Sequence, residues 1–79
     1  MQIKKLSQLG KNQEGVVCDI KADIFLKRRL LELGFVNGTK ITIISVSPLK
    51  NTYLVKITDY ILALRKSCID CINVVVNER

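Results

Sequence analysis

The sequence predicts a mostly β domain, a small barrel of about five strands with one short α-helix after the first strand. Three observations lead to this fold class. The 79-residue chain is long enough for one hydrophobic core and short enough to rule out a second. Short apolar stretches with period-two alternation fill most of it, and turn-forming residues separate them. Only the stretch 23–34 has the period of an amphipathic helix.

The first predicted strand covers 15–20, "GVVCDI". Alternation along a strand places every second side chain on the same face of a sheet. We therefore expect Val16, Cys18 and Ile20 to share the face that points into the core. On this interpretation the Cys18 side chain is a small buried apolar group.

A short helix follows this strand. Asp23 is the expected N-cap, because its carboxylate can accept hydrogen bonds from the free backbone amides of the first turn. Gly34 can adopt the left-handed conformation that ends a helix, and Phe35 can then pack back against Leu30. The helix is expected to run for about ten residues and to bury one stripe. This stripe consists of Leu26, Leu30 and Leu33.

Period-two alternation resumes after a turn at Asn37-Gly38. In the second strand, Ile41 and Ile43 are expected on one face, with Ile44 and Val46 on the other. Pro48 ends this strand, and Thr58-Asp59-Tyr60 forms a tight hairpin loop further on. A segment at 67–70 has room for no more than one helical turn. The remaining predicted strands cover 39–47, 52–57, 61–66 and 72–76.

Five short strands and one helix are too few for a large sandwich. A sheet that closes on itself is the economical solution, and this is the shape of an SH3-like barrel. We expect residues 1–79 to form this one domain. The sequence contains no run of about 20 apolar residues that could cross a membrane. It also has no apolar signal segment at its start, so a cytoplasmic location is expected.

Thirteen basic and seven acidic residues give a net charge of +6, which favours an anionic partner. The basic residues are dispersed, however, and only Lys27, Arg28 and Arg29 are contiguous. On a helix these three span about 200° of arc, so they cannot converge on one phosphate track. Arg28 and Glu32 are spaced for an ion pair on the helix surface. A solvated face is therefore favoured, and nucleic-acid binding is kept as the alternative function.

The chain has three cysteines and no histidine, which removes the commonest general base and the commonest metal ligand. Cys68 and Cys71 form a C-x-x-C pair that could bind zinc or act as a redox dithiol. A single chain offers no fourth zinc ligand and no βαβ unit for a redox site. A site shared between two chains is left open. We expect no cofactor, no metal site and no enzymatic activity.

At this point the order of the signals resembles one family. "RLLELGF" at 29–35, the following Gly38, and "LALRK" at 62–66 are similar to the ferrous iron transport protein A (FeoA) family. The similarity runs from "LSQLGKNQEGVVCDI" to "INVVV", over almost the whole chain. It implies a small cytosolic SH3-like protein that assists Fe(II) uptake. Its implied partner is the membrane transporter FeoB, whose N-terminal part carries a GTPase domain.

The chain departs from the family pattern in two loops. Lys50-Asn51 stands where family members usually carry a Gly-Asp pair, and Asp59 stands where a glycine is common. Asn and Asp both tolerate turn conformations, so the resemblance in fold is unaffected. Lys50, however, introduces a charge opposite to that of the family's loop acid.

The expected partner-binding surface is the helix face around Arg28, Leu31 and Glu32, with Lys50 in the loop 48–51 beside it. Leu31 is off the buried stripe, so it is either an exposed anchor for a partner or packed under the N-terminal segment 3–9. The same surface would bind and regulate the transporter. A homo-oligomer formed through exposed edge strands is also left open. Direct Fe(II) binding has no evident set of ligands.

Overall fold

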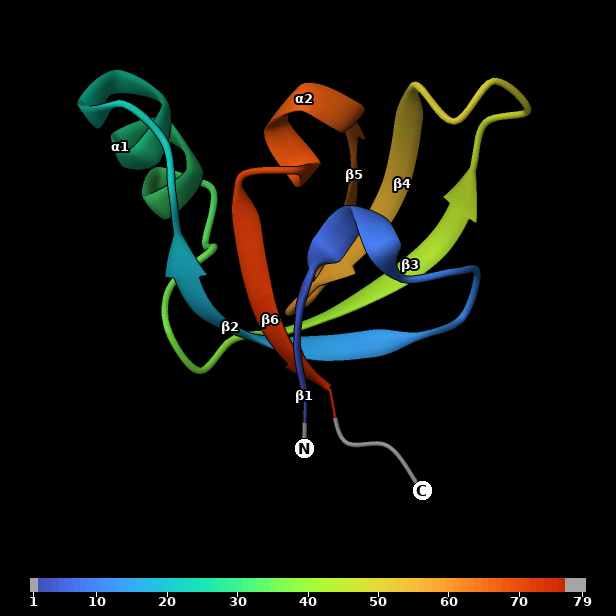
Figure 1. Ribbon diagram of the computed structural model, residues 1–79, viewed down its shortest axis with the longest axis horizontal. Helices are drawn as coiled ribbons and strands as arrows, with labels where there is room; N and C mark the ends of the chain where they lie inside the picture. Colours follow the sequence, from blue (N-terminus) through green and yellow to red (C-terminus); the bar gives the residue numbers. More distant parts are fainter. Residues whose placement is uncertain (1, 77–79) are drawn as a thin grey trace.

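Six antiparallel strands form one sheet that curls into a barrel, and the structure describes residues 2–76 of the chain (Figure 1). The structure is a computed structural model. The strands follow the order β1-β6-β2-β3-β4-β5 across the sheet. In chain order the elements are β1 (Gln2–Lys5), the 3₁₀ turn η1 (Leu6–Gln8), β2 (Glu14–Ile20), α1 (Ile24–Glu32), β3 (Lys40–Val46), β4 (Thr52–Ile57), β5 (Tyr60–Arg65), α2 (Lys66–Ile69) and β6 (Ile72–Val76).

The predicted fold class, a mostly β SH3-like barrel with one short α-helix, is confirmed, although the sheet has six strands instead of about five and α1 follows the second strand instead of the first. One additional strand, β1, was not predicted from the sequence. It pairs with β6 from Gln2↔Val76 to Lys5↔Asn73. Ile3, its one apolar residue, is 70% exposed, so β1 has no alternation that indicates a buried face. Its place in the sheet comes from backbone pairing with β6.

The predicted inward face of β2 is wrong for two of its three residues. Val17 points into the core and Gly15 is buried, whereas Val16 is 40% exposed. The β2–β6 register shifts between Val17 and Asp19, which marks a bulge that reverses the alternation. Cys18 lies half-buried at this bulge, where its thiol donates to the Asn73 carbonyl oxygen, 3.4 Å away. Only Ile20 faces the core as predicted.

A second register shift, between Ile43 and Ser45 in the β3–β4 pairing, marks a bulge in β3. Ile41 and Ile43 are fully buried, as predicted. Beyond the shift Val46 packs against the core, although the sequence pattern placed it on the opposite face. Such bulges increase the local twist and help a sheet to close into a barrel.

The core fills the interior of this barrel with aliphatic side chains and two aromatic rings, Phe35 and Tyr53. Each fully buried aliphatic or Phe side chain contributes about 1.5–3 kcal/mol relative to an exposed one. Within residues 2–76 no charged side chain is buried. The core residues are Leu6, Leu9, Val17, Ile20, Leu30, Phe35, Ile41, Ile43, Tyr53, Val55, Ile57, Ile69, Ile72, Val74 and Val76.

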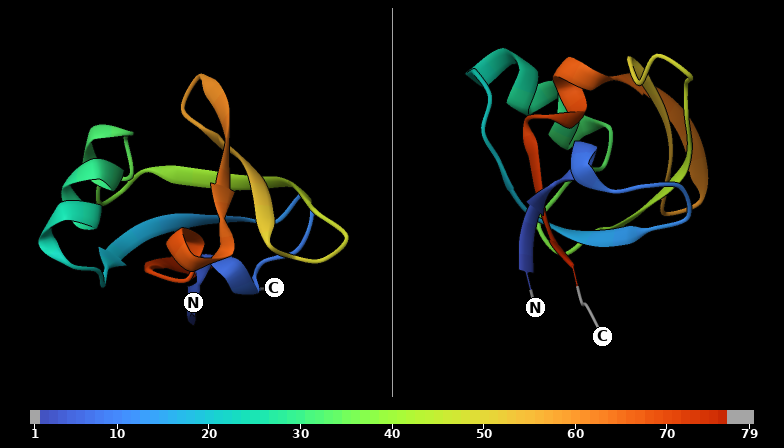
Figure 2. Two further views of the ribbon diagram at one scale, coloured as in Figure 1. Left: turned by 90° about the horizontal axis from the view of Figure 1, so that it is seen from above. Right: turned by 45° about the vertical axis from the view of Figure 1, so that its right-hand side comes forward.

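α1 begins and ends where the sequence predicts. The Asp23 carboxylate accepts a hydrogen bond from the Leu26 amide, 2.9 Å away. At the other end Gly34 has φ 108°, and its amide donates to Leu31 O while the Phe35 amide donates to Leu30 O, each at 3.0 Å. These two bonds define a Schellman motif. The helix lies to one side of the barrel, with Leu30 buried on its inner face (Figures 1 and 2).

Candidate partner-binding site

The outer face of α1 exposes apolar side chains. Phe25 is 80% exposed, Ile24 61% and Leu31 41%. Ile24 and Leu31 are seven residues apart and lie on one row of the helix, with Arg28 between them. Phe25 and Glu32 lie on the neighbouring row, which Arg28 also borders. We call this set the α1 patch; it consists of Ile24, Phe25, Arg28, Leu31 and Glu32.

The position of Leu31 decides between the two alternatives that the sequence left open. The segment 3–9 runs through β1 and η1, on the far side of β2 and β6 from α1 (Figures 1 and 2). The leucines of this segment, Leu6 and Leu9, enter the barrel core instead. Leu31 is therefore a surface residue, and it does not pack under the N-terminal segment.

The expected ion pair between Arg28 and Glu32 does not form. Among residues 2–76, ion pairs join Lys40 to Glu14 and Lys66 to Asp70, each at 3.4 Å. Arg28 and Glu32 are both exposed to solvent. The α1 patch thus offers a guanidinium and a carboxylate beside apolar groups, without an internal pair that would have to be broken on binding.

The C-terminal end of α1 is fixed to the β4–β5 hairpin. The Tyr60 hydroxyl donates a hydrogen bond to the Leu33 carbonyl oxygen. Gly34 lies so close that a β-carbon added there would be 3.3 Å from Ile57 Cδ1. Leu26 and Leu33 pack against the core from the same side. The patch is consequently carried on a helix whose position is set by the barrel.

Ile24 and Phe25 were missed as candidate residues. Both are apolar and both are off the stripe formed by Leu26, Leu30 and Leu33. This is the same criterion that selected Leu31. Applying it to every apolar residue of the helix would have identified the whole patch.

Lys50 does not lie beside the other three candidate residues. The loop between β3 and β4 and the helix α1 are at opposite ends of the long axis of the molecule (Figures 1 and 2). Ser47 organises this loop: its hydroxyl donates to Asn51 Oδ1 at 2.7 Å and accepts from the Asn51 amide at 3.2 Å. Lys50 has φ 58°, a conformation that lysine rarely adopts. Arg28, Leu31 and Glu32 thus share one surface, and Lys50 belongs to another.

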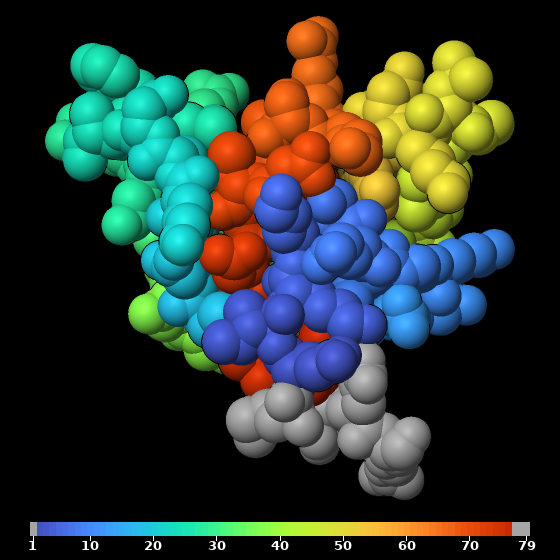
Figure 3. Space-filling view, viewed as in Figure 1, coloured from blue at the N-terminus to red at the C-terminus, as the bar shows by residue number. Residues whose placement is uncertain are grey.

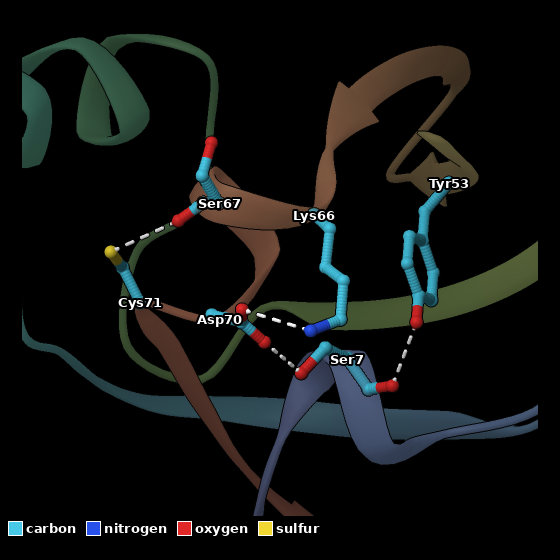
Figure 4. A network of polar contacts seen from close by, with 6 residues as sticks. All are labelled: Ser7, Tyr53, Lys66, Ser67, Asp70 and Cys71. Carbon is cyan, nitrogen blue, oxygen red and sulfur yellow. Dashed lines mark hydrogen bonds and ion pairs between the residues drawn. The ribbon is translucent and has the colours of Figure 1, made fainter. Parts of the chain in front are cut away.

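A polar network joins η1 to α2, which is where the barrel closes (Figure 4). The Ser7 hydroxyl donates to the Asp70 carboxylate, whose other oxygen is 3.4 Å from Lys66 Nζ. The Tyr53 hydroxyl donates to the Ser7 carbonyl oxygen at 3.0 Å. The Ser7 hydrogen bond, with a smaller effect of Lys66, lowers the pKa of Asp70 although partial burial opposes this.

The three cysteines are all half-buried free thiols. Burial is the main cause of the raised pKa of Cys71, and Cys68 adds to the effect. The Cys71 thiol donates to the Ser67 carbonyl oxygen, 3.3 Å away (Figure 4). A raised pKa disfavours the thiolate that metal binding and disulfide exchange require. In the described part of the chain, no three side chains of His, Cys, Asp or Glu converge as metal ligands would.

The barrel and its peripheral helix define a small SH3-like domain protein with an exposed helical face. The FeoA domain model matches residues 4–76. The chain therefore belongs to the FeoA family, which is linked with ferrous iron transport.

A curated relative gives this link. Over 62 residues the chain is 32% identical to the Fe(2+) transport protein A/Fe(2+) transporter FeoB fusion protein of Porphyromonas gingivalis (strain ATCC BAA-308 / W83). The match covers 78% of the chain and 7% of that protein, so the chain spans only a small part of its relative.

Two solved structures share the fold along most of their length. A FeoA-like protein from Clostridium acetobutylicum has a TM-score of 0.89 at 25% identity, over 100% of this chain and 92% of the other. Stenotrophomonas maltophilia FeoA, solved as a complex with zinc and described as an SH3 domain protein, has a TM-score of 0.78 at 31% identity. That match covers 94% of this chain and 89% of the other.

None of the helices in residues 2–76 has the length and apolar character needed to cross a membrane.

Proposed function

We propose that residues 1–79 act as a single cytosolic binding domain that associates with a FeoB-type Fe(II) transporter and regulates it through the α1 patch. The observation that carries the proposal is the exposure of Phe25 and Leu31 on a helix that the barrel holds in place. The partner is suggested by the relative in which the two proteins are one polypeptide. A fused pair of this kind supports association between separate chains.

The chemistry of the α1 patch suits a protein interface. Aromatic and leucine side chains flanked by arginine are common among residues that dominate binding energy. Covering Phe25 and Leu31 would remove apolar surface from water at about 25 cal/mol per Å². Because the α1 backbone is already ordered by Asp23 and Gly34, binding would require little additional loss of conformational entropy.

The domain is proposed to act by contact and to leave ion permeation and GTP hydrolysis to the transporter. A docked helix can regulate a partner only if it binds one conformation of that partner more tightly than another. For a GTPase-bearing transporter this predicts that nucleotide changes the affinity. The dependence on nucleotide then reports whether the domain acts on the GTPase cycle.

The direct test is calorimetric titration of this domain into the purified cytosolic part of the FeoB from the same organism, with and without a GTP analogue. We expect saturable binding, and at least a tenfold loss for Leu31→Asp. Leu49→Asp is the matched control, because Leu49 is 84% exposed in the loop at the other end of the molecule. Circular dichroism of both variants should match that of the wild type.

Three results would contradict the proposal. The first is a titration into the transporter domain that releases or absorbs no heat. The second is an equal loss of affinity for the transporter domain in Leu31→Asp and Leu49→Asp. The third is binding to RNA without binding to the transporter domain. The RNA arm uses single- and double-stranded oligonucleotides over a series of salt concentrations. Phosphate binding weakens steeply as salt rises, because counterions are released, whereas a largely apolar interface changes little.

A further inference from the structure

A groove of about 560 Å³ lies where η1, the β3–β4 side of the barrel and α2 meet. The segments that line it meet on the face shown in Figure 3, coloured blue, yellow and orange. Its volume is within the range of about 300–1,000 Å³ that is typical of ligand sites. Its principal lining residues are Ser7, Leu9, Lys11, Lys50, Tyr53 and Lys66.

The charge of the groove is positive. Lys11, Lys50 and Lys66 reach it from three separate segments of the chain. Among residues 2–76, the carboxylate that contacts one of these lysines, Asp70, is already engaged by the Ser7 hydroxyl and by Lys66. Lys11 and Lys50 are exposed and have no carboxylate within ion-pair distance among the described residues. These two ammonium groups are consequently available to an anionic ligand.

The backbone that carries these lysines is ordered. Next to Lys11, the Asn12 amide donates to the Ile43 carbonyl oxygen at 2.6 Å, which ties the η1–β2 loop to β3. Lys50 is held at φ 58° by the loop that Ser47 organises, where the Lys50 amide donates to the Ser47 carbonyl oxygen at 2.8 Å. An uncommon backbone conformation kept in place by its surroundings is frequent at binding sites.

The rest of the lining distinguishes between anionic ligands. Val46 is partly exposed and gives the groove an apolar wall between its basic residues, while Leu9 and the Tyr53 ring lie beneath it, each 3% exposed. Base stacking needs an exposed aromatic face, but Tyr53 is only 3% exposed and its hydroxyl is bonded to Ser7 O. A polypeptide with carboxylates on both sides of an apolar residue matches basic groups around apolar walls better than a nucleic acid does.

We propose that this groove is a second interaction surface, which binds an extended acidic segment of a protein partner. It is separate from the α1 patch, because the β3–β4 loop and α1 lie at opposite ends of the molecule (Figure 2). The proposal therefore does not depend on the function proposed for α1. A segment in the groove would have its carboxylates beside Lys11 and Lys50 and its apolar side chain against Val46.

The test uses the fluorescein-labelled peptide acetyl-Glu-Leu-Glu-Glu-Leu-Glu-amide, followed by fluorescence anisotropy at low salt. We expect saturable binding, and weakening of roughly five-fold for the Lys11→Gln/Lys50→Gln variant, in keeping with two partly screened ion pairs. The matched control is Lys21→Gln/Lys56→Gln, which removes the same charge from exposed positions outside the groove. This control should bind the peptide as the wild type does, within about two-fold if its effect is only that of net charge.

Amide chemical-shift changes in NMR spectra provide the second measurement. On addition of the peptide they should concentrate on Ser7, Lys11, Lys50 and Lys66. The proposal is overturned by the absence of peptide binding, by equal binding of the peptide with Gln in place of Glu, or by equal weakening in the two lysine variants. Tighter binding of oligouridylate with shifts in the same groove would also overturn it, in favour of a nucleic-acid site. Leu31→Asp should leave peptide binding unchanged, so the two proposals fail independently.

Discussion

At the scale of single residues, Asp70 is the side chain on which the contact between η1 and α2 depends. Its pKa is lowered from the ordinary value of 3.8, chiefly by the Ser7 hydrogen bond. A lowered pKa in the folded state means that folding favours the carboxylate. The corresponding stability is present above the unfolded-state pKa and is lost as the pH falls through the folded-state pKa.

We therefore predict that Asp70→Asn lowers the free energy of unfolding at pH 7 and has a smaller effect at pH 3. Urea denaturation of wild type and variant at both values checks this. Glu32→Gln serves as the control, because Glu32 is exposed on α1 and makes no ion pair with Arg28. An equal loss at pH 7 and pH 3 would mean that the carboxylate charge is not the stabilising feature.

The candidate site could be predicted from the sequence only in part, and the reason also lies with single residues. Helical spacing places Leu31 outside the buried stripe, and Leu31 is exposed as this predicts. The same spacing places Phe25 outside the stripe, and Phe25 is exposed as well. The distance between Lys50 and α1 is set by the tertiary fold. No local spacing specifies on which side of a barrel a loop emerges, so Lys50 was grouped with the wrong surface.

At the scale of the elements, β2 and β6 approach each other closely at Gly15. A β-carbon added there would be 2.7 Å from Val74 Cγ2 and 2.8 Å from Val74 Cβ. Val74 is fully buried, so its side chain has no room to move away. Glycine is required at this point because the two strands could not pair with a side chain between them.

Gly15→Ala is accordingly expected to lower the free energy of unfolding by about 1–3 kcal/mol, as overpacking of a core does. Gly10→Ala is the matched control, since a β-carbon there would meet only Gln13 Oε1 at an ordinary 3.6 Å. Chemical denaturation of both variants distinguishes them. If Gly15→Ala and Gly10→Ala had similar free energies of unfolding, β2 and β6 would be able to move apart to accommodate the added methyl group.

Prediction of the elements succeeded where the signal is local. Asp23, Gly34 and Phe35 specify the two ends of α1 by bonds between residues that are close in sequence. Alternation located β4 and β6 to the residue. It failed at the bulges after Val17 and Ile43, because a bulge is a mismatch with a partner strand and only the pairing reveals it.

At the scale of the whole molecule, the charge distribution is unbalanced. The net charge is +6, and the ion pairs that join Lys40 to Glu14 and Lys66 to Asp70 within residues 2–76 are both partly exposed. Exposed pairs contribute little, so repulsion among the basic side chains is the larger electrostatic effect on folding. Salt screens such repulsion over a distance of about 10 Å at 0.1 M.

Raising NaCl from 20 mM to 500 mM should therefore increase the free energy of unfolding, by less than about 1 kcal/mol. Thermal unfolding in the two buffers measures this, with sodium fluoride in parallel to separate screening from ion-specific effects. A lower melting temperature at high salt would mean that attractive ion pairs outweigh the repulsion.

The pairing of β1 with β6 has a consequence for attachment to other molecules. Gln2 lies opposite Val76, so the two ends of the described chain are neighbours, and both are remote from α1 (Figure 1). Neighbouring ends are the geometry that lets a domain be spliced into a surface loop of a host polypeptide as readily as joined to one of its ends. A linker attached at either end would connect to the same side of the domain. In each arrangement α1 would project away from the point of attachment.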